Sequence, residues 1–292
     1  MHEYLRAVGF AKIKEKEELD RILHLVEESY QTEKTAVNAE GMDFSERRKE
    51  FAPRIGLMLR GEYDRNGNYR SDYYVPYFRG KEEKRYDEIS VERHAEKESY
   101  AAVCDDYDIA MTLIFYVQNV TDYLSERRSG RYSCISGTVK LSGLSTYGRI
   151  LLPVEQKVSE EENADAILQR TKLIKAAREG DEEAMENLTI DDMDTYSMIS
   201  RRIADEDVFS IVATYFMPCG VECDHYNVMG EILELGEVKN GFTGETLYLM
   251  KLECRDLILE VCINKEDLLG EPLVGRRFKG VIWLQGQIIF DA

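Results

Sequence analysis

The spacing of apolar residues predicts an amphipathic helix near the start of the chain, over residues 14–30. Five apolar residues occupy the i, i+3, i+4, i+7 and i+11 positions of one helical face: Leu19, Ile22, Leu23, Val26 and Tyr30. A second, shorter helix is predicted over residues 44–51, where SERRKE lies between two phenylalanines and Pro53 would end it.

From Arg54 onward the apolar pattern changes to a period of two, which is typical of strands. IGLMLRGEY and YRSDYYVPYF flank the sequence DRNGN, and Asn66-Gly67 between extended segments indicates a β-hairpin. Pro76 cannot donate to a sheet, so its strand is expected at an edge or a bulge. Further strand-like runs reach residue 154 and predict an antiparallel meander, with the first helix available to cover one face.

The acidic stretch at residues 156–204 is predicted to be helical. Its first helix, within SEEENADAILQRTKLIKAAREG, is expected to begin at Ser159 as N-cap and to end at Gly180 as the C′ residue. DEEAMENL is predicted as a second helix, and TIDDMDTYSMISRRI as a third helix that Thr189 would cap.

Short apolar runs broken by Gly, Asn and Pro predict a small β unit in the last part of the chain. Six strands are expected: Val208–Met217, Met229–Val238, Thr246–Cys254, Leu257–Ile263, Arg277–Leu284 and Gln287–Phe290. This number suits a small barrel of the oligonucleotide/oligosaccharide-binding (OB) type. The expected fold class is therefore α+β: an N-terminal antiparallel sheet with a covering helix, then C-terminal helices with a small OB-like β-barrel.

Length and charge predict two domains, residues 1–155 and 156–292. A chain of 292 residues exceeds the size at which single cores usually stop growing. The formal net charge of −18 is uneven, because residues 1–155 carry about −4 and residues 156–292 about −14.

Composition excludes some classes of partner. An acidic surface repels phosphate backbones and anionic lipids, so neither nucleic acid nor a membrane is expected as a partner. MHEYLRAVGF lacks the pattern of a signal peptide, and the apolar run Ile109–Val117 is too short to cross a bilayer. The six cysteines are too few for a disulfide scaffold in a chain of this length. A cytoplasmic location is therefore predicted, with no cofactor.

Cys219, Cys223 and His225 form the one candidate metal cluster. Thiolates and imidazole are zinc ligands, and Cys254 or Cys262 could supply a fourth. Structural zinc sites usually combine two paired ligand clusters, however, and no second CxxC or HxxxH occurs. The interpretation as a turn with buried thiols is therefore preferred, and no metal is predicted.

A group of carboxylates is the second candidate site, for a hard cation or for acid–base chemistry. Its members are Asp191, Asp192, Asp194, Asp205, Glu206 and Asp207. No EF-hand spacing occurs, and capping of helix N-termini explains acidic residues there more simply.

The basic sequence GRRFKG is a candidate anion or ligand site in the acidic half. Arg276, Arg277 and Lys279 could bind an anion and Trp283 could stack on a ligand. The alternative is that these cations pair with the acidic helices while Trp283 fills the core.

Four tyrosines of the predicted hairpin form a candidate partner-binding surface: Tyr69, Tyr73, Tyr74 and Tyr77. Tyrosine is favoured at interfaces because it combines a large apolar area with a polar tip. The alternative is cross-strand packing within the sheet.

Several stretches resemble an uncharacterised family of gut and clostridial bacteria, a domain of unknown function. They are LIKAAREGDEEAMENLTIDDMDTYSMISRRI, EDVFSIVATYFMPCGVECDHYNVMGEI, GRRFKGVIWLQGQIIF and the opening MHEYLRAVGF, so the resemblance spans the whole chain. It implies no activity. The residues themselves favour a non-enzymatic binding or adaptor protein that contacts a protein partner or a second copy. The alternative hypothesis is a metal-dependent hydrolase using Cys219, Cys223 and His225.

Overall fold

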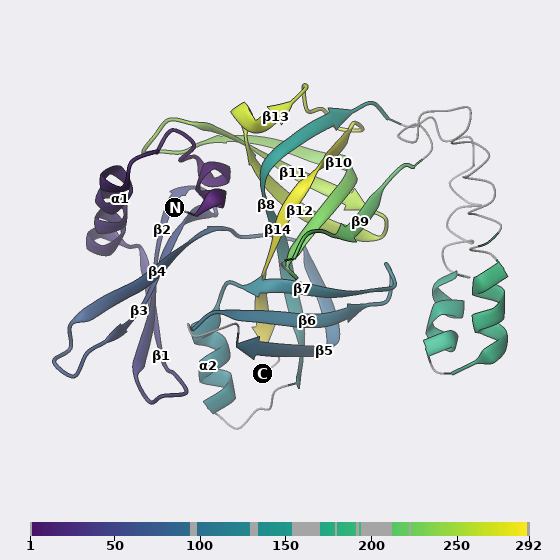
Figure 1. The fold of residues 1–292 in the computed structure, drawn as a ribbon, viewed down its shortest axis with the longest axis horizontal. Helices are drawn as coiled ribbons and strands as arrows, with labels where there is room; N and C mark the ends of the chain where they lie inside the picture. The colour runs from purple at the N-terminus through teal and green to yellow at the C-terminus, as the bar shows by residue number, and fades with distance from the viewer. Residues whose placement is uncertain are drawn as a thin grey trace.

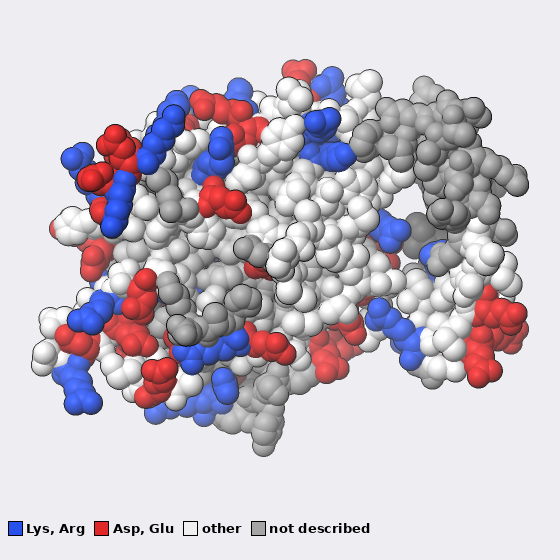
Figure 2. Space-filling view, viewed as in Figure 1, with Lys and Arg blue, Asp and Glu red and all other residues white. Residues whose placement is uncertain are grey.

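The computed structural model describes residues 2–93, 98–128, 134–153, 170–178, 180–190, 193, 212–221 and 223–290. It contains a four-stranded antiparallel sheet, a ten-stranded mixed sheet, and short helices around them (Figure 1). On the face shown in Figure 2, acidic and basic side chains are interspersed around a largely uncharged centre. The predicted α+β class is confirmed, with strands in the majority.

The first sheet contains β1 (Thr32–Val37), β2 (Asp43–Ala52), β3 (Ile55–Tyr63) and β4 (Tyr69–Phe78), paired in chain order. The predicted hairpin is confirmed as β3–β4, where Gly67 takes a positive φ of 81°. Pro76 lies on β4, an edge strand of this sheet, as expected for a residue that has no N–H to donate.

The helix predicted over residues 44–51 is wrong, because these residues form β2. The charged residues of SERRKE find their partners on both neighbouring strands. Glu46 pairs with Arg60 of β3 at 2.7 Å, and Arg47 pairs with Glu33 of β1 at 2.9 Å. These partners lie outside the predicted segment, so tertiary pairing outweighs the local helical pattern.

Two helices precede this sheet. A 3-10 helix, η1 (Glu3–Val8), is followed by α1 (Lys16–Ser29), which confirms the predicted first helix. Leu19, Ile22 and Val26 are buried on the inner face of α1. This face packs on β2 and β3, so the helix covers one side of the first sheet, as expected.

The second sheet is built from strands of both halves of the chain. From the first half come β5 (Glu83–Arg93), β6 (Tyr100–Asp106), β7 (Met111–Val117) and β8 (Cys134–Leu151). From the second half come β9 (Tyr215–Pro218), β10 (His225–Lys239), β11 (Thr246–Cys254), β12 (Leu257–Asn264), β13 (Leu268–Leu269) and β14 (Arg277–Phe290).

The pairings close this sheet into two five-stranded rings that share β8 and β14. The N-terminal ring runs β8–β5–β6–β7–β14 and back to β8. The C-terminal ring runs β8–β12–β11–β10–β14 and back to β8. Each ring contains one parallel contact, β7–β14 or β12–β8. In Figure 1 the two groups of strands lie below and above the crossing point of β8 and β14.

The two shared strands divide their length between the rings. Residues 134–140 of β8 pair with β5, whereas residues 142–145 pair with β12. Similarly, residues 277–283 of β14 pair with β10, and residues 285–286 pair with β7. The ladder between β8 and β14 is therefore the common wall of both rings.

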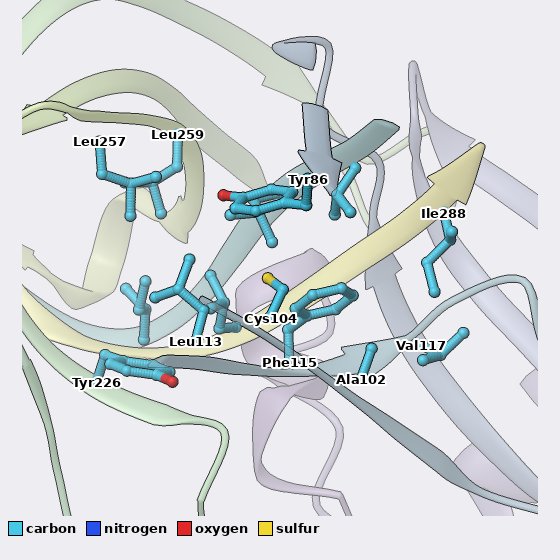
Figure 3. Close-up of a cluster of buried hydrophobic side chains, with 14 of the residues drawn as sticks. Tyr86, Ala102, Cys104, Leu113, Phe115, Val117, Tyr226, Leu257, Leu259 and Ile288 are labelled. Carbon is cyan, nitrogen blue, oxygen red and sulfur yellow. The ribbon is translucent and has the colours of Figure 1, made fainter. Parts of the chain in front are cut away.

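The interiors of the two rings form one continuous hydrophobic core. Figure 3 shows Leu113 and Phe115 of the N-terminal ring in the same cluster as Tyr226 and Leu259 of the C-terminal ring. Gly286 makes room for this packing, because a Cβ at that position would lie 2.4 Å from the ring of Phe115.

Of the strands predicted in the last part of the chain, Thr246–Cys254 matches β11 at both ends, Leu257–Ile263 matches β12 to within one residue, and Met229–Val238 lies inside the longer β10. Val208–Met217 overlaps β9 only over residues 215–217, and residues 208–211 lie outside the described residues. Arg277–Leu284 and Gln287–Phe290 form the single strand β14. The C-terminal ring also needs β8 from the first half of the chain. The boundary predicted at residue 155 falls outside the described residues, and strands from both sides of it share one sheet.

Other helices lie beside the rings. α2 (Val120–Arg128) follows β7, and a short 3-10 helix, η2 (Lys265–Asp267), follows β12. Residues 170–178 and 182–190 are helical, and Gly180 between them has a φ of 94°, as predicted for a C′ residue. The Thr189 hydroxyl donates to the Met185 carbonyl at 2.8 Å, and most of the third predicted helix lies outside the described residues. Ser159 and all six candidate carboxylates of residues 191–207 lie outside the described residues.

Candidate functional site

The N-terminal segment is fastened onto the C-terminal ring and forms one wall of the candidate site. The Glu245 carboxylate accepts the backbone N–H groups of Ala11 and Lys12 at 3.0 and 3.2 Å, and the Asn264 amide at 2.7 Å. The Asn240 amide donates to the Val8 carbonyl at 2.9 Å. These contacts hold η1 across the rings.

Under this segment lies a cavity of about 630 Å³, which we call the aromatic pocket. Four phenol or indole rings line it, Tyr4, Tyr100, Tyr116 and Trp283, together with the imidazoles of His2 and His225. The carboxylates of Glu3 and Asp224 and the thiol of Cys223 complete its polar lining, with Ser99. Its walls therefore come from η1, β6, β7, β10 and β14.

Trp283 stands where these walls meet. Its ring centroid lies 5.3 Å from that of Tyr4, 5.0 Å from that of Tyr116 and 5.0 Å from that of His2. The indole N–H donates to Oδ2 of Asp224 at 2.7 Å, which fixes the orientation of the ring. Trp283 is only 5% exposed, so most of its surface is in contact with the surrounding residues.

Asp224 also orients His225. Its Oδ1 lies 3.0 Å from Nδ1 of His225, so this contact favours a proton on Nδ1. Nε2 lies 4.0 Å from a carboxylate oxygen of Glu3. One carboxylate therefore positions both a ring donor and an imidazole at the pocket wall.

His2 belongs to the opposite wall. Its backbone N–H donates to the Tyr74 hydroxyl at 2.7 Å, and its ring packs on that of Trp283. Burial is the main cause that lowers the pKa of His2 to about 4, and the positive charge of the amino terminus contributes next. The imidazole is therefore neutral at pH 7.

The back of the pocket is braced by a buried ion pair. The Tyr116 hydroxyl accepts a hydrogen bond from Arg60, whose Nη2 lies 2.7 Å from Oε1 of Glu46. Both charged side chains are completely buried. Glu46 also accepts the backbone N–H groups of Val120 and Thr121 at the start of α2, which joins the first sheet to the rings.

The candidate metal residues are not brought together. Cys223 is exposed at the pocket, whereas Cys219 lies on the neighbouring chain segment, with its backbone N–H bonded to the His225 carbonyl at 2.8 Å. Among the described residues, which include these three, no three His, Cys, Asp or Glu side chains could share a metal ion. Of the predicted cluster, only Cys223 and His225 line the pocket.

The residues of the basic candidate site around β14 lie in different surroundings and do not form one site. Arg277 is buried and donates to the carbonyls of Leu152 and Val212 at 2.9 and 2.8 Å, and burial lowers its pKa. Arg276 donates to the Glu271 carbonyl. Arg277 lines a separate cavity of about 960 Å³, and Lys279 is half-buried. Only Trp283 of this predicted group reaches the aromatic pocket.

The four tyrosines of the hairpin pack within the chain. Tyr77 is buried, and burial raises its pKa to about 12. Tyr69 lies 3.8 Å from the Arg47 guanidinium, and Tyr73 donates to the Glu98 carbonyl at 2.6 Å. Tyr74 holds His2, so one of the four supports the pocket wall from behind.

Sequence reasoning reached Cys223, His225 and Trp283 but assigned them to different sites. It missed the residues that the N-terminal segment contributes, His2, Glu3 and Tyr4. The only local signal was the aromatic and charged character of MHEY, which specifies no partner. Their convergence depends on the docking of η1, which no spacing within the sequence reveals.

Comparison with known proteins identifies a family. A family model described as "Domain of unknown function, E. rectale Gene description (DUF3881)" matches residues 5–286. The chain matched no curated protein and no solved structure. In the part of the chain that the structure describes, no helix is long and apolar enough to cross a membrane.

Proposed function

Since the chain belongs to this family of unknown function, we propose its function from the aromatic pocket: it is a binding protein for a small organic molecule. The observation that carries the proposal is the convergence of four aromatic rings around a cavity of about 630 Å³. Ligand sites are typically concave and aromatic, with a few oriented polar groups, and a cavity of this volume suits a small organic ligand.

The polar groups of the pocket favour binding over catalysis. Both oxygens of Asp224 already have partners, the indole N–H of Trp283 and Nδ1 of His225. The carboxylate therefore orients two rings. The alternative prediction, a metal-dependent hydrolase, gains no support, because Cys219, Cys223 and His225 do not converge on a common point.

The predicted protein-partner surface does not coincide with the aromatic pocket. It depended on the hairpin tyrosines, which are half-buried or buried and engaged inside the chain. The pocket therefore replaces the hairpin as the proposed binding site. Likewise, the proposal does not depend on an OB-like reading of the C-terminal ring, because the pocket is built across both rings and η1.

The single tryptophan of the chain, Trp283, makes a direct test possible. Its fluorescence reports on the pocket, so a panel of small cationic, neutral and anionic organic molecules can be titrated against the purified protein. We expect a saturable emission change with at least one class.

Tyr4→Ala should weaken that binding about tenfold or more, since it removes one wall of the pocket. Tyr107→Ala is the matched control, because Tyr107 is 48% exposed and does not line the pocket. A panel without any saturable response would refute the proposal.

A further inference from the structure

Resting on the proposed function, we infer that the ligand of the aromatic pocket is a small organic cation, an amine or a quaternary ammonium group. Two observations lead to this class: the aromatic rings, and the carboxylates among the residues that line the cavity. Each one can be followed in named residues.

The rings supply the first part of the recognition. Aromatic faces carry negative charge density, and indole attracts cations more strongly than phenol or benzene rings do. The ring centroid of Trp283 lies 5.3 Å from that of Tyr4 and 5.0 Å from that of Tyr116, and all three residues line the same cavity. A compact cation that enters the cavity would contact more than one of these rings.

Two carboxylates supply the second part of the recognition. Glu3 and Asp224 contribute carboxylates, and no Lys or Arg is among the described residues that line the cavity. The partners of Asp224 are an indole N–H and an imidazole, and the Glu3 side chain is 69% exposed at the opening. His2 adds no positive charge at pH 7, because burial lowers its pKa to about 4. An anionic ligand would be repelled here and a cation attracted.

The buried guanidinium of Arg60 is separated from the cavity by the Tyr116 ring and does not line it. It lies 5.2 Å from the ring centroid. Glu46 lies 2.7 Å from Arg60 and 3.3 Å from Arg48, so this group contains two guanidinium groups and one carboxylate. None of the three lines the cavity, whereas the carboxylates of Glu3 and Asp224 do.

The test compares choline with its uncharged isostere, in which a tert-butyl group replaces the trimethylammonium group. The two molecules have nearly the same shape, so a difference in affinity reports the charge alone. Using Trp283 emission, we expect choline to bind at least about tenfold more tightly than the isostere. Increasing salt should reduce the difference, because it screens the exposed carboxylate of Glu3.

A variant pair tests the role of the lining charge. Glu3→Gln removes one carboxylate at the pocket opening and should reduce the preference for choline several-fold. Glu17→Gln removes the same charge from an exposed position on α1 and should leave the preference unchanged. Both positions are exposed, so neither variant is expected to disturb folding.

The outcomes separate this inference from the proposal beneath it. Tighter binding of choline, reduced by Glu3→Gln, supports both. Equal affinity for choline and the isostere, or tighter binding of the isostere, overturns the cation inference and leaves a small-molecule pocket. Absence of binding by any member of the wider panel overturns both.

Discussion

Arg60 and Glu46 form an ion pair in which neither side chain reaches solvent, with Nη2 and Oε1 2.7 Å apart. Glu46 belongs to β2 and also accepts the first N–H groups of α2. Arg60 belongs to β3 and donates to the Val117 and Gln118 carbonyls, at 2.9 and 3.0 Å. The pair therefore links the first sheet to the N-terminal ring through charge-assisted hydrogen bonds.

Glu46→Gln should strongly destabilise the fold. The substitution leaves the Arg60 guanidinium buried without its counter-charge, which typically costs about 3–5 kcal/mol. Urea denaturation measures the loss of unfolding free energy. Glu40→Gln is the control, because the Glu40 side chain is 67% exposed and lies 3.7 Å from Arg93. A loss below about 1 kcal/mol for Glu46→Gln would contradict a structural role for the pair.

Replacement of glycine by alanine should cost much more stability at Gly286 than at Gly236. Gly286→Ala would place a Cβ 2.4 Å from the Phe115 ring, at the contact that closes the N-terminal ring, and should cost about 1–3 kcal/mol. Gly236→Ala on β10 meets Leu249 at an ordinary 3.8 Å and should be nearly neutral. Thermal melting of both variants measures the difference. Equal melting temperatures would show that the Phe115 ring can move aside freely.

These examples show what could be predicted from the sequence. Alternating patterns located β11 completely because its signal is local. The same reasoning assigned β2 to a helix, since the partners of its charged residues, Glu33 and Arg60, lie on other strands. Ring closure was also beyond local reasoning, because β8 and β14 are separated by the acidic helical segment. The same holds for the pocket, because its lining residues come from the N-terminal segment, from β6 and β7, and from β10 and β14.

Stability should decrease in mild acid partly through His2. The pKa of His2 is lowered by burial from 6.5 to about 4 in the folded protein, so the unfolded chain binds more protons between these pH values. The contribution of neutral His2 to the free energy of unfolding is therefore fully present above pH 6.5 and is lost as the pH falls toward 4. The total loss is about 2 kcal/mol after allowance for partial exposure.

His2→Gln should flatten the stability curve over that range. Chemical denaturation at a series of pH values gives the slope for wild type and variant. His24→Gln provides the comparison, because the His24 side chain is 67% exposed on α1. If His2→Gln and wild type lose stability in parallel between pH 6.5 and 4, protonation of His2 is not coupled to unfolding.

Glu245→Ala should release the N-terminal segment without unfolding the rings. The variant loses the acceptor for Ala11, Lys12 and Asn264, and leaving such donors unpaired costs about 1–3 kcal/mol locally. Hydrogen exchange should accelerate at residues 3–12, and Trp283 emission should shift to longer wavelength as Tyr4 moves away. Unchanged exchange at these residues would show that other contacts hold η1. Glu266→Ala is the control, since its side chain is 60% exposed and lies 3.6 Å from the Lys12 ammonium group.

The ladder between β8 and β14 has a consequence for the order of folding. A chain grows from its N-terminus, so β5 to β8 are made well before β14, and neither ring can close until β14 arrives. Pairings between such distant segments raise the contact order and slow folding, because a long loop must close first. Until β14 is synthesised, the earlier strands therefore have unpaired edges. The nascent protein is most prone to aggregate during this interval.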